Sequence, residues 1–174
     1  DQLAGGLEQL ANLPIALQLG GEPDCAGLDM MVISPGVPIG APFVRRAQEQ
    51  GVEVIGEVEL AYRLCPAPVC AITGTNGKTT TTALVGEIFK NADRVTHVVG
   101  NIGIPFISQV DQVAPGDVVV AEISSFQLES AVTFRPKVAA ILNLTPDHLN
   151  RHGDMQGYAA AKMRIFERQG PEDT

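Results

Sequence analysis

The stretch AITGTNGKTTTTALV, residues 71–85, carries the residue types of a phosphate-binding loop at an unusual spacing. The common loop pattern, G-x-x-x-x-G-K-[ST], would need a glycine five residues before Gly77, and that position holds Ile72. The first glycine is instead Gly74, which gives the shorter pattern G-x-x-G-K-T. Such a loop binds phosphate only if its backbone and side chains still converge on one point.

The residues of the shortened loop have the properties that phosphate binding requires. Gly74 and Gly77 allow backbone conformations in which N–H groups turn toward an anion, and a helix beginning near Lys78 adds its positive end. The Lys78 amine can neutralise phosphate charge, and the Thr79 hydroxyl can complete a Mg²⁺ shell. An ordinary Gly-rich turn is the alternative, but a preceding strand and a following helix favour the phosphate loop. The predicted nucleotide-binding residues are Gly74, Thr75, Asn76, Gly77, Lys78, Thr79 and Thr80.

Two further polar residues accompany apolar runs that are typical of buried strands. Glu122 lies near the end of DVVVAEI (117–123), where a carboxylate is costly to desolvate unless it is paired or bound to a cation. A Mg²⁺ ion near the loop would satisfy it, and a helix cap or an ion pair with Arg151 is the alternative. Asn101, in GNIGIPF (100–106), follows another strand and is either a binding residue or a turn residue.

The last part of the chain supplies histidines and a lysine. NLTPDHLNRHGD (143–154) contains His148 and His152, and the helical stretch YAAAKMRIF (158–166) has Lys162 in its middle. The histidines could be plain loop residues, and the lysine could lie on the surface with its stem along apolar neighbours. Position favours function, because the phosphate loop, the asparagine, the glutamate and His148 all follow the carboxyl ends of successive strands. Open α/β sheets bind their ligands at that edge.

Composition limits the classes of partner. The chain has 174 residues, is 45% hydrophobic and 18% charged, and has a formal net charge of −8 with a pI near 4.8. These values are typical of a globular protein and argue against nucleic acid or an anionic membrane as the main partner. No apolar stretch is long enough to span a bilayer, and no signal-peptide pattern is present. We expect a soluble, cytoplasmic protein whose three cysteines, Cys25, Cys65 and Cys70, are free thiols.

Short apolar, β-branched runs alternate with helical patterns along the chain. The runs predict strands at 30–34, 52–56, 69–73, 95–99, 117–123 and 137–144, and the patterns between them predict helices at about 42–50, 57–64, 78–90 and 156–168. Continuous apolar runs suit strands buried on both faces of a parallel sheet, so the predicted fold class is α/β, doubly wound. On the third helix, the predicted apolar face consists of Leu84, Val85, Ile88 and Phe89.

The proline-containing segment CPAPVC (65–70) is interpreted as a linker between two α/β units. This linker divides the chain into a first unit, residues 1–65, and a second unit, residues 66–174. The chain begins at Asp1 rather than at a methionine, so we expect it to be a piece of a longer protein.

The ordered set of motifs resembles the Mur ligase family, the ATP-dependent amide ligases of peptidoglycan precursor synthesis. That family uses GTNGKTTTT-type loops, which accounts for the shortened spacing. Within it, EISSFQLE (122–129) and NLTPDHLNRHGDMQGYAAAKMRIF (143–166) look like the branch that adds D-glutamate to UDP-N-acetylmuramoyl-L-alanine. The resemblance covers about residues 30–166, and Asn150 departs from the aspartate of the family pattern. The loop alone would fit the whole family, including folylpolyglutamate synthases.

The resemblance implies a role for each matched residue. The loop would hold the ATP phosphates, and Thr79 with Glu122 would bind one Mg²⁺ ion. Lys162 would carry a CO₂-derived carbamate that binds a second Mg²⁺ ion together with His148. The muramoyl substrate would lie near Asn101, Ser124 and His148, and the uridine nucleotide near the SPGVP turn, at Ser34, Pro35 and Gly36. The residues expected to be catalytic are Lys78, Glu122, His148 and Lys162.

The implied reaction has two steps. A substrate carboxylate attacks the γ-phosphate of ATP, and the D-glutamate amine then attacks the acyl-phosphate to give the amide, ADP and phosphate. Two Mg²⁺ ions and Lys78 would screen the repulsion between the two anions. Lys162 can take up CO₂ only as a neutral amine, so we expect its helix to hold it partly desolvated or near another cation.

The family has three domains, and the resemblance implies that residues 1–65 are part of a Rossmann-like N-terminal domain that binds a uridine nucleotide. Residues 66–174 would be part of a P-loop-type central ATPase domain with a parallel sheet, and we expect the C-terminal amino-acid-binding domain to be absent from this chain. These 174 residues alone are therefore expected not to catalyse the reaction. The complete enzyme would be a monomer that acts on small molecules, with neither nucleic acid nor membrane as a partner. The alternatives are another Mur ligase, a folylpolyglutamate synthase, and a non-catalytic nucleotide-binding relic.

Overall fold

The computed structural model describes residues 10 and 13–174, so the first residues of the predicted N-terminal domain, 1–9 and 11–12, lie outside the described residues. The elements in chain order are β1 (Met30–Ile33), α2 (Pro42–Glu49), β2 (Glu53–Gly56), α3 (Glu57–Leu64), β3 (Val69–Thr73), α4 (Lys78–Asn91), β4 (Thr96–Gly100), η1 (Phe106–Gln112), β5 (Val118–Glu122), α5 (Ser125–Glu129), β6 (Val138–Ile141), α6 (Leu149–His152), α7 (Met155–Met163) and η2 (Arg164–Phe166). Each predicted strand and helix is present, the fourth helix as α7 continued by the short 3-10 helix η2. The helices α5 and α6 and the 3-10 helix η1 were not predicted.

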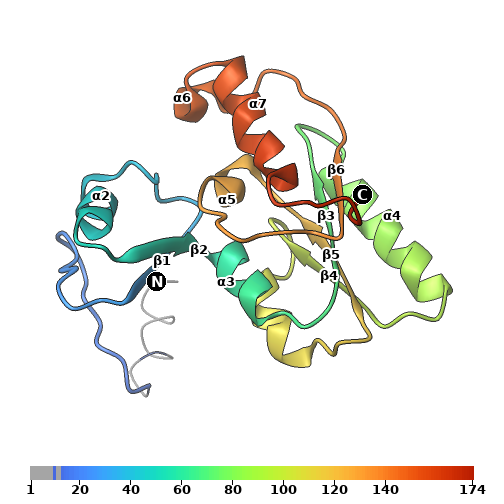
Figure 1. Ribbon diagram of the computed structural model, residues 1–174, viewed down its shortest axis with the longest axis horizontal. Helices are drawn as coiled ribbons and strands as arrows, with labels where there is room; N and C mark the ends of the chain where they lie inside the picture. The colour runs from blue at the N-terminus through green and yellow to red at the C-terminus, as the bar shows by residue number, and fades with distance from the viewer. Residues whose placement is uncertain (1–9, 11–12) are drawn as a thin grey trace.

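The strands form two parallel sheets. β1 pairs with β2 in a small sheet, which lies with α2 to one side of the molecule in Figure 1. The other four strands pair in the order β4-β5-β3-β6, which confirms the predicted α/β class. In this order β3 lies between β5 and β6, and β4 lies on the far side of β5, so all four carboxyl ends lie along the edge from which the loop after β3 begins. Residues far apart in sequence therefore meet at one edge.

The larger sheet is covered on both faces. On one face α4 packs its Val85 and Phe89 against Ile72, Val118 and Val120 of the sheet. On the other face the alternate residues of β5 meet α3, η1, α5 and η2 in the main core, whose members include Val58, Phe106, Val119, Ala121 and Leu128. Because β5 is buried on both faces, its run of apolar residues is continuous rather than alternating.

The predicted apolar face of α4 is only half right. Val85 and Phe89 pack against the sheet, but the side chains of Leu84 and Ile88 are exposed, at 58% and 59% of their full accessibility. The buried face instead includes Gly86, where a Cβ atom would collide with Val98 of β4. A helix that lies this close to a strand needs a residue without a side chain there, and apolarity alone does not reveal such a position.

The helix α3 packs in the core of the larger sheet, and its Arg63 also pairs with Glu53 of β2 in the small sheet at 2.7 Å. Val58 and Ala61 belong to the main core, and the fully buried carboxylate of Glu59 accepts hydrogen bonds from three successive backbone N–H groups. These donors belong to Val132, Thr133 and Phe134. Arg63 pairs with the same carboxylate at 2.8 Å. The domain boundary at residue 65 stays a prediction, but in packing terms the central unit begins at α3.

Two expectations from composition are met. Cys25, Cys65 and Cys70 are free thiols. Among the described residues, every helix is too short or too polar to cross a membrane.

Candidate functional site

The predicted phosphate loop joins β3 to α4. Gly74 has φ of 151° and Gly77 has φ of 81°, both in the region that residues with side chains rarely adopt. Gly77 caps α4, so the N–H groups of Lys78, Thr79 and Thr80 lie in the first helical turn, where they have no acceptor within the helix. These amides and the positive end of the helix are suited to binding an anion.

A residue that sequence reasoning missed, Asn143, braces this loop. Its Oδ1 accepts hydrogen bonds from the N–H groups of Thr75 and Asn76 at 3.2 and 2.9 Å, and its Nδ2 donates to the Asn76 carbonyl at 3.0 Å. The N–H groups of Thr75 and Asn76 therefore hold the loop in shape. The pairing of β6 with β3 brings Asn143 here, and its position near the end of the strand predicted at 137–144 was a signal.

Glu122 meets two of the other predicted residues. It is 2% exposed, its Oε2 accepts a hydrogen bond from the Thr79 hydroxyl at 2.8 Å, and its Oε1 accepts one from Asn101 Nδ2 at 3.2 Å. The alternative pair with Arg151 is wrong, because that arginine binds Glu129. A buried carboxylate beside a hydroxyl supplies the hard oxygen ligands that Mg²⁺ prefers. Among the described residues, no three His, Cys, Asp or Glu side chains lie close enough together to hold a metal ion by themselves.

Gly100 brings Asn101 against Glu122, and we predict that Gly100→Ala disrupts this contact. Gly100 has φ of 127°, and a Cβ atom there would collide with the backbone of Glu122. The variant should lose roughly 1–3 kcal/mol of unfolding free energy in a urea titration and bind nucleotide more weakly. Gly103→Ala is the matched control, since Gly103 also has a positive φ but has open space around it. Equal losses in both variants would mean that the close approach at Gly100 is unimportant.

Lys162 is buried rather than exposed, so the surface alternative is wrong. The residue is 2% exposed, and its Nζ donates to the Gly74 carbonyl at 2.9 Å and to Thr73 Oγ1 at 3.3 Å. Nζ also lies 4.8 Å from the centre of the Tyr158 ring. Burial, together with the positive charge of Lys78, lowers the pKa of Lys162 to about 8. The expected desolvation and the expected neighbouring cation are both present.

A cavity of about 250 Å³ gathers most of the predicted catalytic and substrate-binding residues. It is lined by Lys78, Asn101, Ser124, Ser125, Phe126, Asp147, His148, Tyr158 and Lys162. Ser124 caps α5 through a reciprocal pair of contacts with Gln127, which fixes the start of that helix at the cavity wall. A lysine amine of lowered pKa, a phosphate loop and a histidine therefore face one enclosed space, a combination typical of an active site.

The two histidines of the DHLNRH stretch differ. His148 caps α6, has a half-exposed side chain and faces the cavity. His152 is buried, lies 3.0 Å from the Ser125 hydroxyl through Nε2, and has its pKa lowered by burial. The ring of Phe126 packs against both histidines. The sequence spacing alone could not separate the cavity residue from the structural one.

The turn predicted to bind a uridine nucleotide lies next to this cavity. Ser34 and Pro35 line a second hollow of about 360 Å³, and Asn101 lines both hollows. Gly36 is not among the lining residues of the second hollow, and its carbonyl faces Arg151 of α6. The structure thus brings the turn of the small sheet to the same edge as the loop of the larger sheet.

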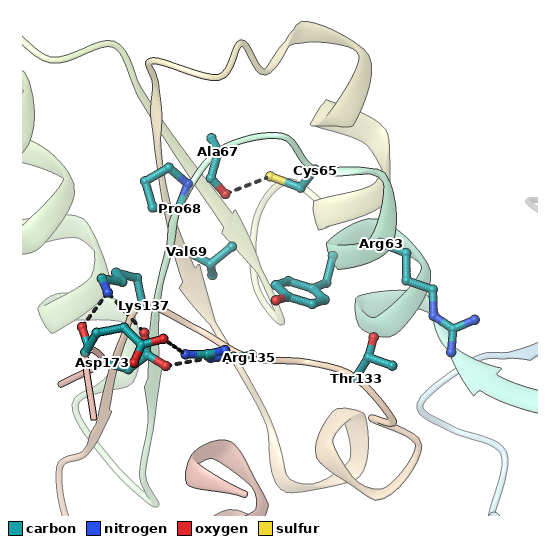
Figure 2. A pocket seen from close by; sticks show the side chains of 11 residues that line it. Arg63, Cys65, Ala67, Pro68, Val69, Thr133, Arg135, Lys137 and Asp173 are labelled. Carbon is teal, nitrogen blue, oxygen red and sulfur yellow. Dashed lines mark hydrogen bonds and ion pairs between the residues drawn. The ribbon is translucent and has the colours of Figure 1, made fainter. Parts of the chain in front are cut away.

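Another hollow, of about 540 Å³, lies at the other end of the sheet and is shown in Figure 2. It lies near Val69 and Lys137, at the amino-terminal starts of β3 and β6, and its cations are already paired. Arg135 and Lys137 both bind Asp173, at 2.6 and 3.2 Å. With these positive charges neutralised, size alone does not make this hollow a phosphate site.

Comparisons with known proteins agree with the geometry. Residues 72–174 match the family model described as the Mur ligase middle domain. The chain is 57% identical to the UDP-N-acetylmuramoylalanine–D-glutamate ligase of Alkaliphilus oremlandii, over 99% of this chain and 39% of that protein. It is 56% identical to the enzyme of the same name from Pelotomaculum thermopropionicum, over 97% of this chain and 38% of that protein.

A solved structure supports the fold. The UDP-N-acetylmuramate:L-alanyl-γ-D-glutamyl-meso-diaminopimelate ligase of Neisseria meningitides superposes with a TM-score of 0.58 at 19% identity. The match covers 98% of this chain and 58% of that one. Of the curated relatives that it matches, by contrast, the chain spans about two fifths of the length.

Proposed function

The chain belongs to the Mur ligase family, and we propose that the full-length protein adds D-glutamate to UDP-N-acetylmuramoyl-L-alanine at the expense of ATP. One observation carries this proposal: the buried amine of Lys162 faces the same cavity as Lys78 of the phosphate loop, Asn101 and His148. The similarity to relatives that are named D-glutamate ligases supports the choice of amino acid. On this proposal the reaction takes place in the cytoplasm, between small molecules, in a monomeric enzyme.

The substrate would lie across both hollows. Its uridine nucleotide would contact the turn at Ser34 and Pro35, and its muramoyl end would reach past Asn101 toward Ser124 and His148. This placement leaves the substrate carboxylate near the anion-binding start of α4. The carboxylate could then attack the γ-phosphate of ATP, and the amine of D-glutamate would attack the resulting acyl-phosphate.

The charged residues would let two anions approach each other. The Lys78 amine, which donates to the Thr75 carbonyl at 2.9 Å, lies at the loop and could turn to the phosphates. Thr79 and Glu122 would hold one Mg²⁺ ion, which when bound would neutralise charge on the transferring phosphoryl group. A second ion would be held by His148 and a carbamate on Lys162.

The lowered pKa of Lys162 supports the carbamate. With a pKa near 8, a substantial fraction of the amine is neutral at pH 7–8 and can attack CO₂. Carbamylation converts a buried cation into an anion, which removes the repulsion from Lys78 and would create a metal ligand.

An amino-acid panel tests the proposal. The full-length protein, supplied with ATP, Mg²⁺ and UDP-N-acetylmuramoyl-L-alanine, should release phosphate when D-glutamate is added and not when L-alanine, meso-diaminopimelate or L-glutamate is added. Ligation of another amino acid would assign the protein to another branch of the family. The absence of any ligation, with nucleotide binding retained, would favour a nucleotide-binding relic.

A further inference from the structure

Arg151, on α6, makes contacts in both α/β units. Its Nη2 donates to the Val37 carbonyl at 3.2 Å, and its Nη1 lies 3.5 Å from the Gly36 carbonyl. Nη2 and Nε also bind the carboxylate of Glu129 at the end of α5, the closest approach being 2.6 Å. The arginine and Glu129 are both only 16% exposed, so water screens this ion pair weakly.

The same guanidinium is connected to the cavity through one ring. Its Cζ lies 4.7 Å from the centre of the Phe126 ring, and that ring is 4.9 Å from the ring of His148. Phe126 and His148 both line the cavity that contains Lys162. A continuous set of contacts therefore runs from the turn at Gly36–Val37 to His148.

The geometry suits arginine and no other side chain. A planar guanidinium has five N–H donors in a fixed fork, so it can bind a carboxylate, reach two carbonyl oxygens and stack on an aromatic face at once. Lysine could keep the positive charge but would lose the fork and the stacking. Two carbonyls of the turn, those of Gly36 and Val37, face this one side chain.

We propose that Arg151 is a positioning residue, which holds the Ser34–Val37 turn in register with His148. The inference rests on the proposed function, because a long substrate bound at the turn and reacting in the cavity would be aligned by these contacts of Arg151, called the clamp below. A displacement of about 1 Å at one end of such a substrate can slow its reaction by roughly 10²-fold. ATP, bound at the loop that follows β3, would be unaffected.

Steady-state kinetics of the full-length enzyme test this role. Arg151→Met should lower kcat/KM for UDP-N-acetylmuramoyl-L-alanine by about 10- to 100-fold, with KM for ATP unchanged within about twofold. Arg151→Lys should recover little of the loss, because the fork is absent. Glu129→Gln should act in the same direction, and the double variant should lose less than the sum of the two single losses. Arg135→Met, which removes an arginine paired with Asp173 far from the cavity, is the control and should leave both constants unchanged.

Two results would overturn the clamp: an unchanged kcat/KM in Arg151→Met, or an equal loss for ATP and the uridine substrate. Hydrogen exchange provides a readout without turnover, since the Val37 N–H, bonded to the Ser34 carbonyl at 2.9 Å, should exchange faster in Arg151→Met than in wild type. Unchanged exchange there would also count against it. If the wild-type enzyme did not turn over UDP-N-acetylmuramoyl-L-alanine, the proposed function would be overturned instead. The hydrogen-exchange measurement would still test whether Arg151 holds the turn in place.

Discussion

A Lys162→Ala variant of the full-length protein is expected to lose ligase turnover by roughly 10²- to 10³-fold, the loss expected when an active site loses one electrostatic stabiliser. The variant removes the only atom on that side chain that could carry the carbamate. Added formate or acetate should restore part of the activity, because a small carboxylate can enter the space left beside Gly74 and Thr73. Phosphate release is the measurement. Wild-type turnover in the variant would remove Lys162 from the mechanism.

Lys162→Met should, in contrast, stabilise the folded protein at neutral pH. The pKa of Lys162 is lowered from an ordinary value of 10.5 to about 8, first by burial and then by Lys78. Folding therefore disfavours the protonated amine, and below about pH 8 the folded state carries the whole of this penalty. As pH rises from 8 toward 10.5 the unfolded chain also loses its proton, and the penalty disappears.

The stability gain should accordingly depend on pH in a defined direction. The variant should be more stable by about 1–3 kcal/mol at pH 7, less than the pKa difference implies because two hydrogen bonds to Nζ are lost. The gain should shrink toward pH 10, as measured by urea unfolding. Lys90→Met, which removes an exposed lysine paired with Glu87, is the control and should show no such trend. A gain that grows with pH would contradict the lowered pKa.

The second prediction with a large expected effect distinguishes the roles of two buried carboxylates, Glu122 and Glu59. Glu122→Gln is expected to lower kcat by about 10²–10³-fold, because a neutral amide at Thr79 neither attracts nor holds Mg²⁺. Its stability should change little, since the amide oxygen can still accept from Asn101 Nδ2 while the amide nitrogen donates to the Thr79 hydroxyl. The apparent affinity for Mg²⁺, titrated at saturating ATP, should fall in parallel with turnover.

Glu59→Gln is the matched control and should show the opposite pattern. Its carboxylate accepts three backbone N–H groups and pairs with Arg63, so the variant should lose about 3 kcal/mol of unfolding free energy. Although burial opposes it, hydrogen bonds from Thr133, Val132 and Arg63 lower the pKa of Glu59. The stability that the wild-type carboxylate contributes is therefore present above its ordinary pKa of 4.5 and is lost as pH falls through the lower folded value. Equal losses of activity in both variants would show that the loss in Glu122→Gln comes from changing a buried carboxylate and not from losing a metal ligand.

Local patterns predicted most of the regular structure. The strands were visible because each buried run is continuous, and the helix after the loop because its polar and apolar residues recur at helical spacing. The helices α5 and α6 have five and four residues, too few to show a helical period. The start of α5 does have a local signal, because Ser124 and Gln127 have the spacing of a capping box. The exposed Leu84 and Ile88 show the limit of the method, since a periodic pattern identifies apolar positions but not the direction of the sheet.

The sequence by itself determined the chemistry: a shortened phosphate loop at Gly74–Thr80, a carboxylate in a buried run, and a lysine within a helix. Tertiary structure decided which groups meet. The strand order β4-β5-β3-β6 brings Glu122 to Thr79 and Asn143 to the loop, and the packing of α7 buries Lys162 against the Gly74 carbonyl. These contacts join residues separated by 43 to 88 positions. Spacing along a chain carries no information about such pairs, and a lysine has its ordinary pKa until folding removes the water around it.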